Sequence, residues 1–427
     1  MRQNILLLGS GGREHALALK MRKSPLCGKL YIAPGNAGTS EVGSNVDLPL
    51  NDFEAIGSFC LSNHISMVVV GPEEPLVRGI YDFFAGNENL KHISVIGPSR
   101  EGARLEGSKA YGKKFMAEKN IPTAAYREIT DLSDGIRFLQ SLKAPYVLKA
   151  DGLAAGKGVV ILNDLSEAEK ELKAMLSGKF GEGNRTVVIE EFLSGIEFSV
   201  FVLTDGISYR VMPVAKDYKR VGENDTGLNT GGMGAISPVP FVTKSMMKKV
   251  EDRIIKPTIE TLRNRKINYH GFIFIGLISV NNEPYVIEYN CRMGDPETEV
   301  VMPLLKTDLV KLFNKVSENK LSEIRVEKYN KTAATIMLVA GGYPGDYKKG
   351  DLIKIPEAIN GDTTIYHAGT TRKDGKLITN GGRVLAITSL GEDINDARKK
   401  SGEIAKKISF DNKYFRADIG LDLLKKK

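Results

Sequence analysis

The stretch from residue 288 to residue 299 combines hard oxygen donors, a guanidinium group and several further carboxylates. The residues before it predict a strand, and alternate side chains of a strand share one face. Glu288, Asn290 and, if the extended chain continues, Arg292 should therefore lie on one side, with Ile287 and Tyr289 on the other. Carboxylate and amide oxygens suit Mg²⁺, and an arginine stabilises a phosphoryl group during transfer. An exposed polar strand face would explain Glu288 and Asn290 alone, but not the acidic turn that follows.

A glycine-rich segment at residues 149–158 follows a second predicted strand and contains three glycines and two lysines. Only three residues separate Gly152 from Gly156, so the segment does not have the Walker spacing. A flexible loop can still close over a triphosphate while Lys149, fixed on the strand, neutralises phosphate charge. We interpret the segment as a nucleotide loop, because a structural turn has no need of two lysines.

Residues 9–14, Gly-Ser-Gly-Gly-Arg-Glu, lie between a short apolar strand and a predicted helix, where a dinucleotide fold has its phosphate loop. Glu14 replaces the third glycine of that pattern, which disfavours a nicotinamide site. The amide groups of Gly11 and Gly12 at the start of the helix would still bind a phosphate, and Arg13 would add positive charge. A simple tight turn is the alternative.

Two further segments are weaker signals. Residues 225–234 are polar and rich in glycine, and we expect neither helix nor strand there; such a loop binds a ligand or is simply mobile. Residues 190–193 end another predicted strand, where backbone groups can read an adenine edge, and Glu197 follows closely enough to bind ribose hydroxyls. We interpret His15 and His367 as structural, because no metal-binding spacing accompanies them.

The chain that positions these groups is too long, at 427 residues, for one compact core. Residues 1–105 alternate apolar strands, glycine turns and helices, which predicts an open parallel α/β domain with ligands at the carboxyl ends of its strands. We divide the remainder into residues 106–328 and 329–427. The middle region contains a predicted amphipathic helix at 246–262 and a hairpin at 272–289.

Composition excludes several classes of protein. Lys and Arg number 60 against 52 Asp and Glu, a modest excess that we attribute to a solvated surface rather than to nucleic-acid binding. An anionic small substrate would also suit this charge. The three cysteines lack any C-x-x-C spacing, and no apolar run reaches the ~18 residues of a membrane span. We expect a cytoplasmic protein that binds neither nucleic acid nor membrane.

As an ordered set, ten short motifs resemble the glycinamide ribonucleotide synthetases, also called phosphoribosylamine-glycine ligases, of the ATP-grasp superfamily. The motifs are GSGGREHA at 9–16, APGNAG at 33–38, GPEEPL at 71–76, KADGLAAGKGV at 149–159, DYKRVGENDTG at 217–227, NTGGMGA at 229–235, EYNCRMGDPETE at 288–299, GGYPGDY at 341–347, HAGT at 367–370 and NGGRV at 380–384. One departure is Leu228, where the family commonly has proline.

The resemblance implies a multidomain α/β and α+β protein: an N-terminal open parallel α/β domain, an ATP-grasp core with a mobile small subdomain at about 123–195, and a C-terminal α+β domain. It implies that ATP phosphorylates glycine, and that 5-phosphoribosylamine attacks the glycyl phosphate to give glycinamide ribonucleotide in purine biosynthesis. ATP would be the co-substrate, with Mg²⁺ or Mn²⁺, in a monomer or weak homo-oligomer. Another ATP-grasp carboxylate-amine ligase is the alternative.

The resemblance also implies roles for individual residues. Those implied for ATP are Lys109, Lys149, Glu191, Leu193 and Glu197. Those implied for the metal are Glu288 and Asn290. Those implied for catalysis are Arg292, Asp295 and Lys149. Those implied for substrate binding are Gly11, Gly12, Arg13, Glu14, Gly35, Asn36, Gly71, Pro72, Glu73, Asn229, Thr230, Gly231, Gly232, Met233, Gly234, Pro296 and Glu297.

Overall fold

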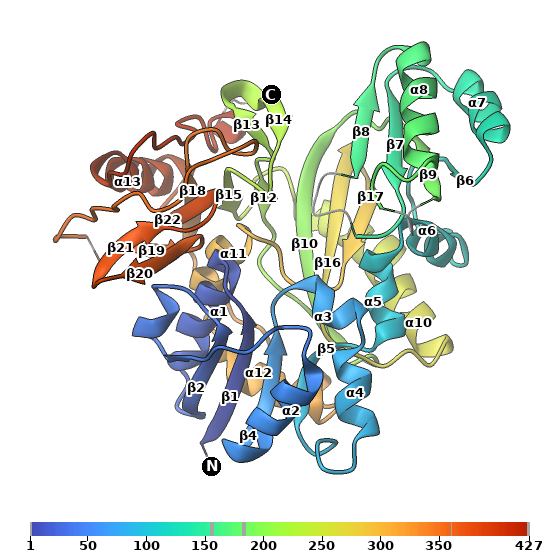
Figure 1. Ribbon diagram of the computed structural model, residues 1–427. Helices are drawn as coiled ribbons and strands as arrows, with labels where there is room; N and C mark the ends of the chain where they lie inside the picture. Colours follow the sequence, from blue (N-terminus) through green and yellow to red (C-terminus); the bar gives the residue numbers. More distant parts are fainter. Residues whose placement is uncertain (1, 154–157, 182–184, 360, 425–427) are drawn as a thin grey trace.

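The short apolar strands of the first region form the parallel sheet that their sequence predicts (Figure 1). The computed structural model describes residues 2–153, 158–181, 185–359 and 361–424. The strand order is β5-β4-β1-β2-β3, and Gly9, Gly35 and Gly71 lie where β1, β2 and β4 end at one edge. The elements are β1 Gln3–Gly9, α1 Gly12–Arg22, β2 Cys27–Pro34, β3 Ser44–Asn45, α2 Phe53–Ser62, β4 Ile65–Val70, α3 Glu73–Val77, α4 Ile80–Gly86, β5 Ser94–Pro98, α5 Arg100–Gly107 and α6 Lys109–Ala117.

This sheet continues beyond the first region. β5 pairs antiparallel with β16 through Pro98 with Tyr269 and Gly97 with His270, which produces one nine-stranded sheet. The added elements are β10 Ile196–Thr204, β11 Tyr209–Val211, β16 Tyr269–Val280 and β17 Glu283–Asn290. Buried apolar side chains from both regions pack in the same two cores. The expected boundary near residue 105 therefore lies between two parts that share a sheet.

The predicted amphipathic helix and hairpin of the middle region are both present. The helix consists of α9 Lys244–Val250, a π-helical turn Glu251–Ile255 and α10 Lys256–Asn264. The hairpin joins β16 to β17 through Asn281 and Asn282, which both have positive φ, as a tight two-residue turn requires. The helices α11 Thr298–Leu304 and α12 Leu309–Ser317 follow the hairpin.

The prediction that residues 225–234 form neither helix nor strand was wrong. β14 Thr226–Asn229 pairs with β13 Arg220–Gly222, and β15 Gly234–Ser237 begins at the last residue of the segment. The turn between β13 and β14 uses the positive φ of Asn224 and Asp225. The buried guanidinium of Arg416 holds this hairpin by donating to the Arg220 carbonyl and the Asp225 carboxylate. The pairing partners lie far away in sequence, so local composition does not show them.

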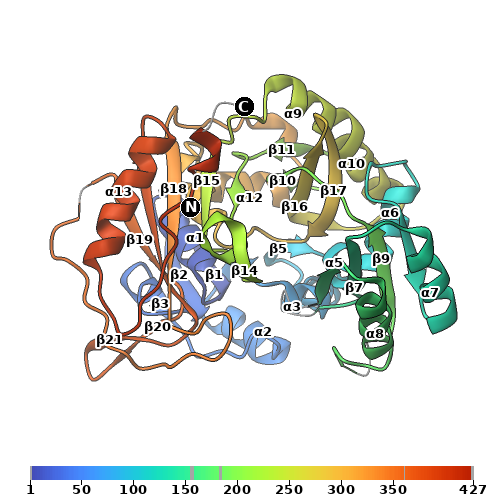
Figure 2. The same ribbon diagram turned by 90° about the horizontal axis from the view of Figure 1, so that it is seen from above.

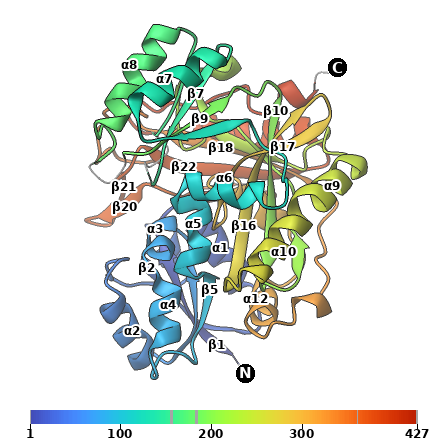
Figure 3. The ribbon, with the colours of Figure 1, turned by 90° about the vertical axis from the view of Figure 1, so that its right-hand side faces the viewer.

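A small separate sheet forms the part for which a mobile subdomain is expected (Figure 3). Its strand order is β6-β9-β7-β8. The helices α7 and α8 pack on one face of this sheet, and together they enclose a separate apolar core. The elements are β6 Tyr126–Ile129, α7 Leu132–Ser141, β7 Tyr146–Ala150, β8 Val159–Leu162, α8 Leu165–Leu176 and β9 Val187–Glu191. Movement of this subdomain stays a prediction.

The C-terminal region lies across the molecule from the small sheet (Figure 2). Its sheet has the order β12-β15-β18-β22-β19, so it includes two short strands from the middle region. The elements are β12 Lys216–Asp217, β18 Thr332–Val339, β19 Thr363–His367, β20 Thr370–Lys373, β21 Lys376–Thr379, β22 Arg383–Gly391 and α13 Ile394–Lys407. The expected α+β character is confirmed. Within the described ranges, no helix has the length and apolarity needed to cross a membrane.

Two buried histidines join the first and last regions. The backbone amide of His367 in β19 donates to Nδ1 of His15 in α1 at 2.8 Å, and the two rings lie 5.6 Å apart. Asn36 donates to the His367 carbonyl at 2.8 Å. Burial lowers the pKa of His15 to about 3, with a further contribution from His367, and burial lowers the pKa of His367 to about 4. Both rings are therefore neutral near pH 7, and their interpretation as structural residues agrees with these contacts.

We expect acidification to weaken this interface. The unfolded chain binds protons at His15 and His367 near pH 6.5, whereas the folded chain does not until pH 4 or below. Stability is therefore complete above pH 6.5 and is lost as the pH falls, by about 1.4 kcal/mol per histidine per pH unit. Thermal unfolding between pH 7 and 5 should show a shallower pH dependence for His367→Gln than for the wild type. The exposed His92→Gln is the control, and equal slopes in all three proteins would contradict the assignment.

Candidate functional site

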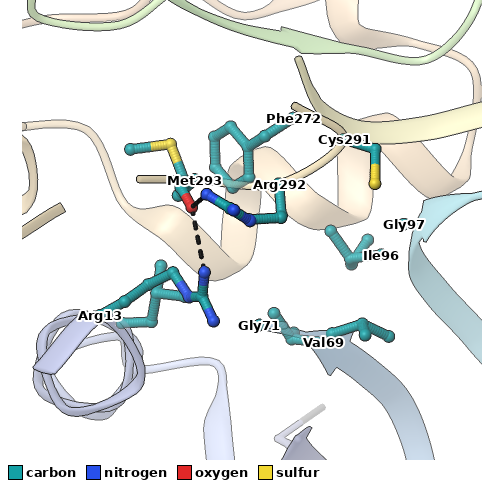
Figure 4. Close-up of a pocket in the computed structure, with 11 residues that line it drawn as sticks. Arg13, Val69, Gly71, Ile96, Gly97, Phe272, Cys291, Arg292 and Met293 are labelled. Atoms are coloured by element: carbon teal, nitrogen blue, oxygen red, sulfur yellow. Dashed lines mark hydrogen bonds between the residues drawn. The ribbon is translucent and has the colours of Figure 1, made fainter. Parts of the chain in front are cut away.

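The three regions surround one cleft with a volume of about 910 Å³. It brings together all of the residues predicted for ATP, metal and catalysis. The predicted residues that line it are Arg13, Glu73, Lys109, Lys149, Glu191, Leu193, Glu197, Asn229, Thr230, Gly231, Glu288, Asn290, Arg292, Asp295 and Glu297. Gly71 lies instead in a small adjoining cavity with Arg13 and Arg292 (Figure 4). The other predicted residues belong to neither lining: Gly11, Gly12, Glu14, Gly35, Asn36, Pro72, Gly232, Met233, Gly234 and Pro296.

Glu288 and Asn290 face the cleft, but the strand does not alternate regularly. The register with β16 shifts between Gly276, opposite Glu288, and Leu277, opposite Val286, which leaves Ile287 as an extra residue. Ile287 consequently lines the cleft beside Glu288, contrary to the prediction that it faces away. The strand ends at Asn290, so extension does not persist to Arg292.

The side chains of Glu288 and Asn290 are not used in contacts that hold the fold together. Among the residues that the structure describes, Glu288 has no ion pair or side-chain hydrogen bond, and neither atom of the Asn290 side-chain amide has a hydrogen-bond partner, so its oxygen is available as a ligand. A carboxylate and an amide with free capacity, adjacent on one wall, fit the hard oxygen ligands that Mg²⁺ or Mn²⁺ takes. The predicted metal pair is therefore chemically suitable.

Lys149 lies in a buried chain of charges that the sequence did not reveal. Its ammonium lies 2.9 Å from Glu190, and Glu190 lies 3.2 Å from Lys113. Burial lowers the pKa of Lys113 to about 8 against the opposing effect of Glu190. Lys109 donates to the Gly152 carbonyl at 3.1 Å. Residues 154–157 of the predicted nucleotide loop lie outside the described residues.

Arg292 is held by two carboxylates, one from α3 and one from α5. Its guanidinium lies 3.3 Å from Glu73 and 2.7 Å from Glu106. Arg292 and Arg13 both donate to the Met293 carbonyl, at 3.2 Å and 3.3 Å, so the two guanidinium groups lie close together (Figure 4). Sequence reasoning missed Glu106, since no motif marks it.

In the first glycine loop, residues 9–14, the Glu14 carboxylate binds the donors of the loop itself. The Gly11 amide donates to the Glu14 carboxylate at 2.6 Å, and Arg13 pairs with the same carboxylate at 2.5 Å. Glu14 also lies against Gly9 and Gly71, where any side chain would overlap it. The residue that departs from the dinucleotide pattern thus takes up donors that were expected to bind phosphate.

Asp295 connects all three regions. It accepts from the Arg13 amide at 3.2 Å and lies 3.1 Å from Nη1 of Arg383 in β22. Arg383 also donates to the carbonyls of Gly231 and Asp295, at 2.8 Å and 2.7 Å. Burial opposes ionisation of the half-buried Asp295, but its pKa is lowered, because Arg383 and Arg13 outweigh that effect. Arg383 belongs to the NGGRV motif, so a signal for it was available.

Glu297 is the predicted residue whose charge state changes most readily near neutral pH. Burial and the neighbouring Asp217 carboxylate raise its pKa to about 7, against the opposing effects of Lys219 and Arg292. Ser199 donates to it at 3.3 Å. A carboxyl group with a pKa near 7 is suited to accept and release protons at physiological pH.

The residues predicted for adenine and ribose lie on the wall nearest the small sheet. Glu191 ends β9 and accepts from the Ala125 amide at 2.8 Å, and Leu193 follows it. Glu197 in β10 is paired with Lys219 at 2.8 Å. All three line the cleft, so they are placed as the prediction requires, while their roles remain predictions.

Comparison with known proteins shows the family. Models of the phosphoribosylglycinamide synthetase N domain, ATP-grasp (A) domain and C domain match residues 3–106, 107–298 and 333–422. The phosphoribosylamine-glycine ligases of Pasteurella multocida and Haemophilus influenzae are each 45% identical, over 98% of this chain and 97% of theirs.

Comparison with solved structures agrees with this family assignment. The crystal structure of the Thermotoga maritima phosphoribosylamine-glycine ligase is similar with a TM-score of 0.85 and 36% identity, covering 97% of this chain and 100% of that one. The biotin carboxylase domain of Hydrogenobacter thermophilus 2-oxoglutarate carboxylase has a TM-score of 0.74 at 17% identity over 97% of this chain and 92% of that one, which shows a shared fold alone. The resemblance seen in the motifs is thus confirmed, and the chain belongs to the phosphoribosylglycinamide synthetase family.

Proposed function

We propose that this chain is an ATP-dependent ligase that joins glycine to 5-phosphoribosylamine, giving glycinamide ribonucleotide, ADP and phosphate in purine biosynthesis. One observation carries the proposal: a single cleft is lined by Lys109 and Lys149, by Glu288 and Asn290, and by Asp295. A triphosphate, a divalent cation and a positively charged amino group could all be bound there. The family and its ligase relatives support the choice of substrates.

The first step transfers the terminal phosphoryl group of ATP to glycine. A glycine carboxylate oxygen attacks the γ-phosphorus, the bond to the ADP oxygen breaks, and glycyl phosphate forms. Lys109, Lys149 and Arg292 supply positive charge where the transferred oxygens carry negative charge. On the adjoining wall, Glu191, Leu193 and Glu197 are assigned to adenine and ribose.

The second step is attack of the phosphoribosylamine nitrogen on the acyl carbon, with loss of phosphate from glycine and of a proton from the amine. Glu297 is assigned as the acceptor of that proton, because its pKa lies near 7. The loops at residues 11–14, 35–36 and 71–73, with residues 229–234 and Pro296, are assigned to the amine substrate and the reacting centre. The closed cleft must exclude water, which would hydrolyse the intermediate.

Glu288 and Asn290 are assigned to Mg²⁺ or Mn²⁺, since both line the cleft and their side-chain oxygens make no hydrogen bond to the described residues. A bound cation would neutralise phosphate charge and orient the triphosphate. The proposal also includes a cytoplasmic enzyme that binds neither nucleic acid nor membrane and acts as a monomer or weak homo-oligomer, which sedimentation of the purified protein would test.

The proposed reaction is tested by ADP release with ATP and magnesium, omitting glycine or freshly generated phosphoribosylamine in turn. We expect release that is sustained only when both are present. Sustained ADP release that needs neither would overturn the choice of substrates, and other carboxylate and amine pairs would then be screened.

Replacing Glu288, the carboxylate assigned to the metal, should lower kcat and increase the magnesium concentration that the enzyme requires. Glu288→Gln keeps the shape but removes the charge, so we expect the magnesium concentration for half-maximal activity to rise by about 10- to 100-fold. Glu283→Gln on the same strand is the control, because that residue is partly exposed and pairs with surface Lys249 and Arg253. An unchanged magnesium requirement in Glu288→Gln would place the metal elsewhere.

The pH dependence of kcat should reflect the ionisation of Glu297. Because its pKa is raised to about 7, the group is protonated below pH 7 and cannot accept a proton there, so kcat should fall on acidification. Glu297→Gln should lower kcat by about 100-fold and remove the acidic limb. Exposed Glu327→Gln should retain the wild-type profile. An acidic limb that persists in Glu297→Gln would assign the proton to another group.

A further inference from the structure

The carboxyl group of Glu299 is buried without a donor. Glu299 lies in the first turn of α11, is 0% exposed, and neither of its oxygens has a hydrogen-bond partner among the described residues. Its Oε1 lies so close to the start of α1 that a Cβ at Gly12 would overlap it. An ionised carboxylate in such a place would lose its hydration without compensation, so the group is expected to hold a proton instead.

The charged and titratable groups around Glu299 favour the same conclusion. Asp295 precedes it by one turn, Glu297 lies beside it, Arg383 approaches from β22 and Tyr366 from β19. Arg383 is the cation of this group, and its Nη1 is already directed to the Asp295 carboxylate and to the carbonyls of Gly231 and Asp295. Burial and Asp295 raise the pKa of Glu299, and Arg383 only partly opposes them.

Of the two neighbouring acids, Asp295 and Glu299, Asp295 is the one that carries the negative charge. It has the Arg13 amide at 3.2 Å and Arg383 at 3.1 Å, and it lies at the N-terminus of α1, where the helix dipole favours an anion. The two carboxyl groups are neighbours at the start of α1, with Oδ2 of Asp295 against Gly11 and Oε1 of Glu299 against Gly12, and the Glu299 carboxyl contributes to the lowered pKa of Asp295. Asp295 lines the cleft, whereas Glu299 lies behind it.

We propose that Glu299 is a positioning residue that stays a neutral carboxylic acid and donates its proton to Asp295, so that the pair presents one negative charge to the amino group of glycine. This inference rests on the proposed function for the identity of the amino group. A glycine ammonium carries one positive charge, and a single fixed carboxylate balances it without a second buried anion. The neutral acid also fixes the orientation of Asp295, as a supporting hydrogen bond does for a metal-binding side chain.

Substitutions of Glu299 and Asp295 distinguish a neutral Glu299 from an ionised one. Glu299→Gln retains a neutral donor of the same shape, so kcat/KM for glycine should stay within about 3-fold of the wild type. Asp295→Asn removes the charge and should lower kcat/KM for glycine by about 100-fold. Glu299→Leu removes the donor and should raise the KM for glycine more than that for ATP. A loss in Glu299→Gln as large as that in Asp295→Asn would show that an ionised Glu299 is needed and would overturn the proposal.

An infrared difference spectrum tests protonation without relying on turnover. Wild-type protein minus Glu299→Gln at pH 7 should contain the carbonyl band of a protonated carboxylic acid. A spectrum with carboxylate bands only would overturn the proposal even in an active, correctly folded enzyme. Thermal unfolding provides the folding control, since Glu299→Gln should be as stable as the wild type. If the acid band is present but ADP release does not depend on glycine, the proposed substrate fails while the protonated pair stands.

Discussion

The half-buried carboxylate of Asp295 requires donors that no single region of the chain can supply. One donor is the Arg13 amide at the start of α1, and the other is Arg383 in β22, near the opposite end of the sequence. The turn that follows β17 therefore reaches its final arrangement only when the first and last regions pack against it. Because a buried carboxylate without partners is unfavourable, the assembly of the cleft and the docking of the three regions depend on each other.

Two cations that line the cleft are likewise paired with carboxylates from distant segments of the chain. Arg292 is paired with Glu73 and Glu106, and Lys149 with Glu190. Such pairs are weak evidence for stability, since desolvation offsets much of the attraction. Their clearer consequence is geometric: the positive groups are fixed in the wall of the cleft before charge develops during reaction, which is the condition for electrostatic catalysis.

The sequence predicted the features that depend on local spacing. The parallel strands of the first region, the amphipathic helix and the hairpin ending at Glu288 and Asn290 are all present. It did not predict the extra residue at Ile287, because a shift in register depends on the partner strand and leaves no mark in the strand's own alternation.

The partners of the functional groups were also missed. Glu106 and Lys113 belong to no motif, and Glu190 was considered only as part of the strand end at 190–193. Only the folded chain brings these three residues beside Arg292 and Lys149. The roles of the predicted site residues likewise depend on ligands, and they remain the subject of experiment.

The pairing of β5 with β16 has a consequence for dividing this protein into pieces. The expected boundary near residue 105 separates strands that are hydrogen-bonded neighbours in one sheet. A fragment ending there would leave the end of β5, at Gly97 and Pro98, without its partner strand β16. The first region is thus a recognisable unit of sequence that shares its sheet and its hydrophobic cores with the middle region, so we expect a fragment cut at this boundary to be less stable than the same residues in the whole chain.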